Sequence, residues 1–90
     1  MSGSPILFGA GEFSQLIRAY LPKLWSKIEF IIVDDIQGVR GFDKPVFLIN
    51  DVDLHERDIV VGVHPMHCKA VEKRLLALGA ASARSPIETT

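Results

Sequence analysis

The apolar positions along the chain follow two different spacings, which predict helices and strands in alternation. Residues 12–21 carry apolar side chains at helical spacing, and the stripe continues as far as Trp25. Pro22 lacks an amide hydrogen and disfavours helix at the residue before it, so we predict a break there and a further turn beyond it. The stripe consists of Phe13, Leu16, Ile17, Tyr20, Leu21, Leu24 and Trp25. We expect Tyr20 and Trp25 to lie in the core or at a subunit interface.

Short apolar runs predict the strands. Residues 6–8 form the first run, and residues 28–33 and 58–63 are rich in β-branched side chains, which suits buried strands. Residues 45–49 form a short strand that Pro45 confines to a strand start or a sheet edge. A weaker run at residues 81–84 predicts a last strand.

The connections carry the expected turn and helix signals. Residues 37–44 contain two glycines and several charges and are predicted to form a loop. Asn50 or Asp51 is a candidate cap for a single helical turn that ends at Leu54. His64 and Pro65 open a second long helix, which Gly79 ends. Its inner face is predicted to consist of Val71, Leu75 and Leu78.

This order of elements predicts the α/β class. Strands that alternate with helices favour a mostly parallel sheet with right-handed crossovers, so we predict a small Rossmann-like domain with four to five strands and helices on both faces. The 90 residues, 48% of them hydrophobic, are expected to form one domain over residues 1–90. Residues 1–4 are a possible tag or flexible start, and residues 85–90 are a possible flexible tail.

Charge and cysteine content narrow the classes of function. The net charge of −1 provides no field that would attract a polyanion, so we expect no nucleic-acid partner. Cys68 is the only cysteine, which excludes an internal disulfide and predicts a cytoplasmic location. No apolar run approaches the ~20 residues of a membrane span, so no membrane partner is expected.

The turn after the first strand is the leading candidate for a binding site. Gly9 and Gly11 in G-x-G spacing join a strand to a helix, as in loops that hold phosphate groups. The amide groups of Gly11, Glu12 and Phe13 are then expected to face the anion, although the Glu12 carboxylate opposes one. Ser14 stands where the dinucleotide fingerprint has its third glycine, and its hydroxyl is a candidate replacement contact. The alternative is a tight turn that requires positive φ and binds nothing.

Two further groups of polar residues follow strands of the same predicted sheet. Asp34 comes 23 positions after Gly11, near the distance at which an acidic residue accepts a ribose hydroxyl in dinucleotide-binding folds. Asp34 and the following Asp35 are the candidate ligand contacts there. The alternative is that both are solvated turn residues paired with Arg40 or Lys44.

The fourth strand is followed by Gly62 and His64, which are also candidate ligand contacts at this edge of the sheet. His64, His67 and Cys68 invite a metal interpretation, but their spacing turns Cys68 away from the histidines. Helix capping or plain exposure of the histidines is the alternative, and Cys68 is expected in the core. We predict no metal site and no catalytic residue.

Four segments resemble the amino-terminal Rossmann-like domain of bacterial sugar O- and N-acyltransferases of the sialic-acid and bacillosamine type. They are Ile6-Leu7-Phe8-Gly9-Ala10-Gly11, Phe30-Ile31-Ile32-Val33-Asp34-Asp35, Ile59-Val60-Val61-Gly62-Val63 and Lys73-Arg74-Leu75-Leu76-Ala77-Leu78-Gly79. In those enzymes the domain holds the nucleotide end of a nucleotide-sugar. The resemblance therefore implies that Gly9, Gly11, Ser14, Asp34 and Asp35 contact a UDP-sugar or another nucleotide.

The sequence also departs from that family. Glu12 and Phe13 replace a Gly-His pair, and His64 and Pro65 replace a polar stretch. The hexapeptide repeats of the acyltransferase β-helix are absent from the sequence, so we expect a nucleotide-binding module of sugar modification and not a complete acyltransferase. The alternatives are an NAD-binding domain of an oxidoreductase and a module that binds no nucleotide and serves oligomerisation. Expected partners are the nucleotide, a second copy in a homodimer, or a larger sugar-modifying enzyme.

Overall fold

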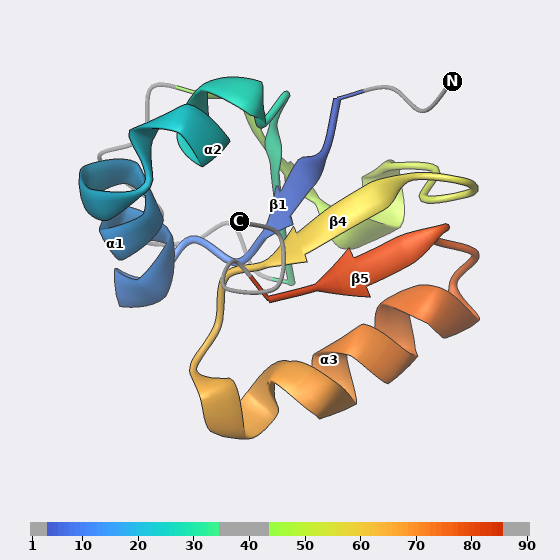
Figure 1. The fold of residues 1–90 in the computed structure, drawn as a ribbon. Helices are drawn as coiled ribbons and strands as arrows, with labels where there is room; N and C mark the ends of the chain where they lie inside the picture. Colours follow the sequence, from blue (N-terminus) through green and yellow to red (C-terminus); the bar gives the residue numbers. More distant parts are fainter. Residues whose placement is uncertain (1–3, 35–43, 86–90) are drawn as a thin grey trace.

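A parallel sheet with helices on both faces forms the domain in the computed structural model, which describes residues 4–34 and 44–85 (Figure 1). Within these residues five strands pair in the order β3-β2-β1-β4-β5, and every pairing is parallel. The predicted α/β class is confirmed. The elements are, in chain order, β1 (Ile6–Phe8), α1 (Glu12–Tyr20), α2 (Pro22–Lys27), β2 (Ile31–Val33), β3 (Val46–Leu48), the 3-10 helix η1 (Ile49–Asp51), β4 (Asp58–Val61), α3 (Pro65–Ala77) and β5 (Ser82–Arg84).

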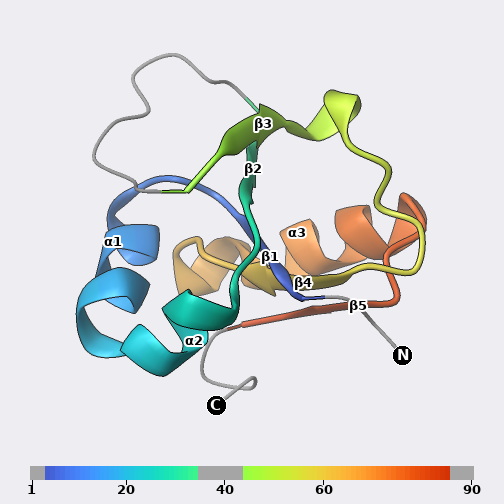
Figure 2. The ribbon, with the colours of Figure 1, turned by 90° about the horizontal axis from the view of Figure 1, so that it is seen from above.

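Two hydrophobic clusters cover the two faces of the sheet, because successive side chains of a strand point to opposite faces. Helices α1 and α2 lie on one face and α3 lies on the other (Figures 1 and 2). The buried residues of the first cluster are Leu7, Ile17, Leu24, Trp25, Ile28, Ile31, Val33 and Val60. The buried residues of the second are Ile6, Phe8, Ile32, Ile49, Leu54, Ile59, Val61, Leu75, Ala80 and Ala83. Strand β1 is central, and its side chains belong to both clusters, so it is part of the core on each face of the sheet.

The helical stripe breaks at Pro22 as predicted, but its side chains do not all reach the core. Leu24 and Trp25 are buried in α2, as expected for a further turn. Leu16 is 46% exposed and Tyr20 is 76% exposed, so of the two expected positions for Tyr20, the core is excluded within this domain and the subunit interface stays a prediction. Helix α1 ends at Tyr20. Helix α2 begins at Pro22, and its residues pack against the sheet from there on.

The second long helix also packs through a narrower face than predicted. Leu75 is fully buried and Val71 packs against the core, whereas Leu78 is 52% exposed. The helix ends at Ala77 and Leu78 is its C-cap, so the helical spacing no longer determines where Leu78 points. Gly79 follows with a φ of 103°, which confirms its predicted role as the stop. The predicted single helical turn before β4 is the 3-10 helix η1. It ends at Asp51 and not at Leu54 as expected, and no side chain caps it.

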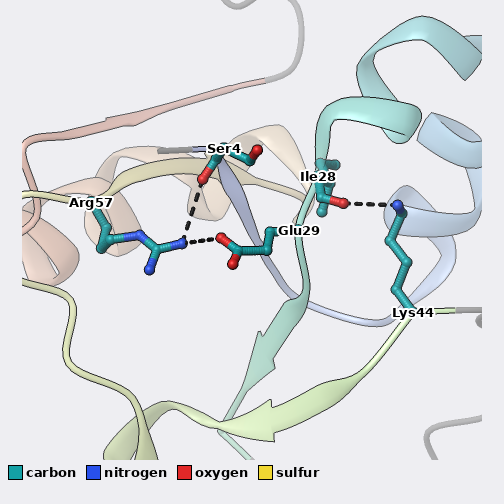
Figure 3. Close-up of polar contacts among 5 residues, drawn as sticks. All are labelled: Ser4, Ile28, Glu29, Lys44 and Arg57. Atoms are coloured by element: carbon teal, nitrogen blue, oxygen red, sulfur yellow. Dashed lines mark hydrogen bonds and ion pairs between the residues drawn. The ribbon is translucent and has the colours of Figure 1, made fainter. Parts of the chain in front are cut away.

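Side-chain contacts fix the start of β2 at the amino edge of the sheet (Figure 3). Arg57 Nη2 donates to Glu29 Oε2 at 2.6 Å, and its guanidinium lies over the Phe30 ring. Lys44 Nζ donates to the Ile28 carbonyl at 2.7 Å and lies over the Trp25 ring. These contacts hold the residues before β2 at the edge opposite the glycine turns.

Candidate functional site

The topology brings two glycine turns together at the carboxyl edge of the sheet. Strand β1 has β2 on one side and β4 on the other, so the order of strands reverses at β1. The turn after β1 begins at Gly9, and the turn after β4 begins at Gly62. In open parallel sheets, ligand-binding crevices form at this reversal. The predicted convergence of the two turns is therefore present in the fold.

The two turns approach each other so closely that only glycine fits at either position. Gly9 has a φ of 102°, and a Cβ atom there would lie 2.9 Å from the Gly62 carbonyl oxygen. A Cβ atom on Gly62 would lie 2.6 Å from Ser14 Oγ and 2.9 Å from Leu7 Cδ1. Gly9 thus serves the packing of one turn against the other, and Gly62 serves the packing of its turn against β1 and the first turn of α1.

Ser14 contacts both turns through its side chain. The residue is fully buried, and its hydroxyl donates to the Gly9 carbonyl at 2.6 Å and lies 3.4 Å from the Gly62 carbonyl oxygen. The expectation that Ser14 offers its hydroxyl to a ligand is wrong, because the hydroxyl hydrogen is used inside the protein. Ser14 is instead the residue that locks the turn after β1 to the turn after β4.

Replacing Ser14 with alanine is expected to lower the free energy of unfolding by about 1–3 kcal/mol, because the Gly9 carbonyl loses its buried donor. Urea denaturation would measure the change. Ser26→Ala is the matched control, since the exposed Ser26 hydroxyl donates to the Lys23 carbonyl at 2.8 Å, and its loss should cost no more than about 0.5 kcal/mol. Equal costs for the two variants would contradict the locking role.

The amino end of α1 opens outward at the same edge. Gly11 is the exposed N-cap, with φ −97° and ψ −157°, and α1 begins at Glu12. Apart from its chain neighbours, no described atom would lie within 4 Å of a Cβ at Gly11. The first amide groups of a helix have no carbonyl partner within it and carry partial positive charge. This end of α1 can therefore receive an anion.

The amino end of α3 follows the turn after β4 at the same edge of the sheet. His64 Nδ1 accepts a hydrogen bond from the Met66 amide at 3.2 Å, so the capping interpretation of His64 is confirmed. In the neutral ring the proton then resides on Nε2. The His64 ring meets the half-buried Phe13 ring edge to face, with 5.4 Å between centroids, and lies 6.3 Å from the His67 ring. Phe13 and His64 thus connect the starts of the two helices.

The remaining candidates for metal binding do not come together in the part of the chain that the structure describes. Cys68 packs against the core, and its thiol donates to the Val63 carbonyl at 3.5 Å. Among residues 4–34 and 44–85, no three His, Cys, Asp or Glu side chains are placed to share a metal ion. The expected core position of Cys68 agrees with this packing.

Asp34 follows β2 at the same edge, but its carboxylate is held by an unpredicted partner. Arg74 on α3 donates through Nη2 to Oδ1 at 2.6 Å and through Nη1 to Oδ2 at 2.9 Å. These hydrogen bonds, and secondarily the guanidinium charge, hold the pKa of Asp34 below its ordinary value, and slight burial opposes them. Lys44 contacts Ile28, so the alternative that paired Asp34 with Arg40 or Lys44 does not hold for Lys44, and Asp35 and Arg40 lie outside the described residues.

The sequence analysis did not predict the pairing of Asp34 with Arg74. One signal was available in the alternation of β2. Ile32 belongs to the cluster under α3, so Asp34, two residues further, is expected on the same face, within reach of a long cation on α3.

These features define the class of protein as a small parallel α/β domain of Rossmann-like architecture with an open helix end at the reversal of strand order. Comparison with protein-family models, with curated protein sequences and with solved structures finds no match to this chain. None of the described helices combines the length and the apolar character that a membrane span requires.

Proposed function

We propose that this domain binds the diphosphate group of a nucleotide or nucleotide-sugar at the amino end of α1. The observation that carries the proposal is the position of that helix end, which is exposed, bears no side chain at Gly11 and lies where the strand order reverses. The sequence resemblance to the amino-terminal domain of sugar acyltransferases supports a UDP-sugar as the ligand. A module of cytoplasmic sugar modification is the corresponding role.

Each neighbouring residue has a part in the proposed complex. The amides of Glu12 and Phe13 and the glycine at position 11 form the phosphate contact, because helix amino ends favour anions. His64 Nε2 lies on the α3 side as a donor for a phosphate or sugar oxygen. Asp34 lies at the end of β2, where the ribose would be placed, but both of its carboxylate oxygens already accept hydrogen bonds from Arg74. No side chain in this set is assigned chemistry beyond binding.

An NAD-binding domain is the second candidate, and the strand order favours it. Dinucleotide-binding halves have the order 3-2-1 with an acidic residue after the second strand, and both features occur here. Arg74 already engages both oxygens of Asp34, which weakens the ribose contact on which NAD recognition relies.

A module for self-association is the third candidate. Leu16 and Tyr20 are one turn apart on α1 and are exposed, so they share an outward face of this helix. Exposed apolar side chains that gather on one face are typical of contact surfaces between proteins. A homodimer through α1 is compatible with nucleotide binding at the carboxyl edge.

The test is a thermal-shift titration with UDP, a UDP-sugar, ADP and NAD on the wild-type domain and on Gly11→Val. UDP at ~100 times its Kd is expected to stabilise the wild type by ~2.7 kcal/mol. Gly11→Val should weaken UDP binding about tenfold or more, because the new side chain stands between the phosphate and the amides.

The unliganded Gly11→Val variant should differ from the wild type by no more than about 1 kcal/mol, since the space around Gly11 is open and its φ is ordinary. Stabilisation of the wild type by NAD alone would favour the oxidoreductase domain. A flat screen together with concentration-dependent dimers would favour the self-association module and contradict our proposal.

A further inference from the structure

The Asp34 carboxylate is paired within the protein. Both of its oxygens accept a hydrogen bond from the Arg74 guanidinium, at 2.6 and 2.9 Å, in a paired fork geometry. Such bidentate pairs are the strongest form of the arginine–carboxylate contact. Their side chains remain 46% exposed for Arg74 and 55% exposed for Asp34, so water and solutes reach the pair.

The pair lies directly beside the glycine turn. The Gly9 amide donates to the Ile32 carbonyl at 2.9 Å, and Asp34 is two residues beyond Ile32. A nucleotide with its phosphates at the start of α1 therefore has its ribose near the end of β2, where an acidic residue usually accepts the 2′-hydroxyl. Here that hydroxyl meets a carboxylate of which each oxygen already accepts a charge-assisted hydrogen bond from Arg74.

We propose that Arg74 is a specificity-determining residue that competes with the ligand's ribose for the Asp34 carboxylate, an inference that rests on the nucleotide site proposed above. The ribose contact then contributes little, and the phosphate contact at α1 determines most of the affinity. The domain accordingly discriminates poorly between ribose and deoxyribose ligands. Removal of Arg74 releases the carboxylate and restores that discrimination.

The experiment compares UDP with 2′-deoxy-UDP by isothermal titration on the wild type, Arg74→Met and Lys73→Met. The two ligands carry the same charge, so the ratio of their Kd values cancels the general attraction between Arg74 and phosphate. Lys73 is an exposed cation on the same turn of α3 and is the matched control for lost charge. The preference for UDP should rise about two- to fivefold in Arg74→Met, because the free energy of a surface ion pair corresponds to a change of that size. It should stay at the wild-type value in Lys73→Met.

Two further variants connect the effect to Asp34. Arg74→Lys keeps the charge and loses the fork, so its preference for UDP should lie between the wild type and Arg74→Met. The double variant Asp34→Asn with Arg74→Met should lose the rise in preference for UDP that Arg74→Met shows alone. Thermal unfolding of each variant checks the fold, which a half-exposed pair affects little.

An unchanged preference in Arg74→Met would overturn the competition. A reduced preference would show that Arg74 itself binds the ribose, which also overturns it. If UDP fails to bind the wild type in the first titration, the nucleotide site itself is wrong and the inference falls with it. Binding of UDP to the wild type with no change in Arg74→Met leaves the site standing and removes only the role of Arg74.

Discussion

Replacing Gly9 with alanine is expected to lower the free energy of unfolding by about 2–5 kcal/mol. An L side chain at positive φ costs about 1–2 kcal/mol, and an overlap in a packed region adds about 1–3 kcal/mol. Gly9 has a φ of 102°, and its Cβ would lie 2.9 Å from the Gly62 carbonyl, whose position the sheet fixes. Urea denaturation followed by circular dichroism measures the loss.

The matched control is Gly11→Ala, two residues further along the same turn. Gly11 has an ordinary φ of −97° and open space around its Cβ. Alanine is a poorer N-cap but restricts the unfolded chain, and these effects offset each other to within about 1 kcal/mol. If the two alanine variants were equally stable, the close approach of the turns would not explain the glycine at position 9.

Leu75→Ala is expected to destabilise the domain by about 2–5 kcal/mol, because it removes a fully buried side chain from the contact between α3 and the sheet. A typical domain is stable by only about 5–15 kcal/mol, so this single change removes a large share of the total. Equilibrium unfolding in urea would show a lower midpoint with a similar slope.

The neighbouring Leu76 provides the control for this substitution. Its side chain is 48% exposed on the same helix, so Leu76→Ala should change stability by about 0.5 kcal/mol or less. A cost for Leu76→Ala as large as that for Leu75→Ala would mean that α3 contacts the sheet through a different face.

The order of the elements was predictable because each depends on local signals. Pro22 ends one helix and begins the next, and Gly79 stops α3 with positive φ. Exposure was harder to predict from the same patterns. Tyr20 continues the apolar stripe of α1, yet it stands in solvent because α2 replaces α1 against the sheet. Helical spacing determines which residues share a face, but not how far the neighbouring layer extends.

The candidate site was predictable in position and only partly in composition. Parallel strands place their carboxyl ends at one edge, so the convergence of the turns at Gly9 and Gly62 follows from the α/β order. The partners of Ser14 and Asp34 do not follow from it. Ser14 reaches Gly62, 48 residues away, and Asp34 is held by Arg74, 40 residues away. The alternation of β2 indicates the face on which Asp34 lies, but which side chain of the facing helix reaches it depends on the twist and stacking of the layers.

The buried hydroxyl of Ser14 also has a consequence for the energetics of association. It fastens the two turns together, so the rim that they form at the carboxyl edge of the sheet has a fixed shape. A rigid rim loses little conformational freedom when a molecule docks, so most of the contact energy is retained as affinity. Loosening this rim would make the edge more adaptable and its complexes shorter-lived, while every group that faces the solvent stayed the same.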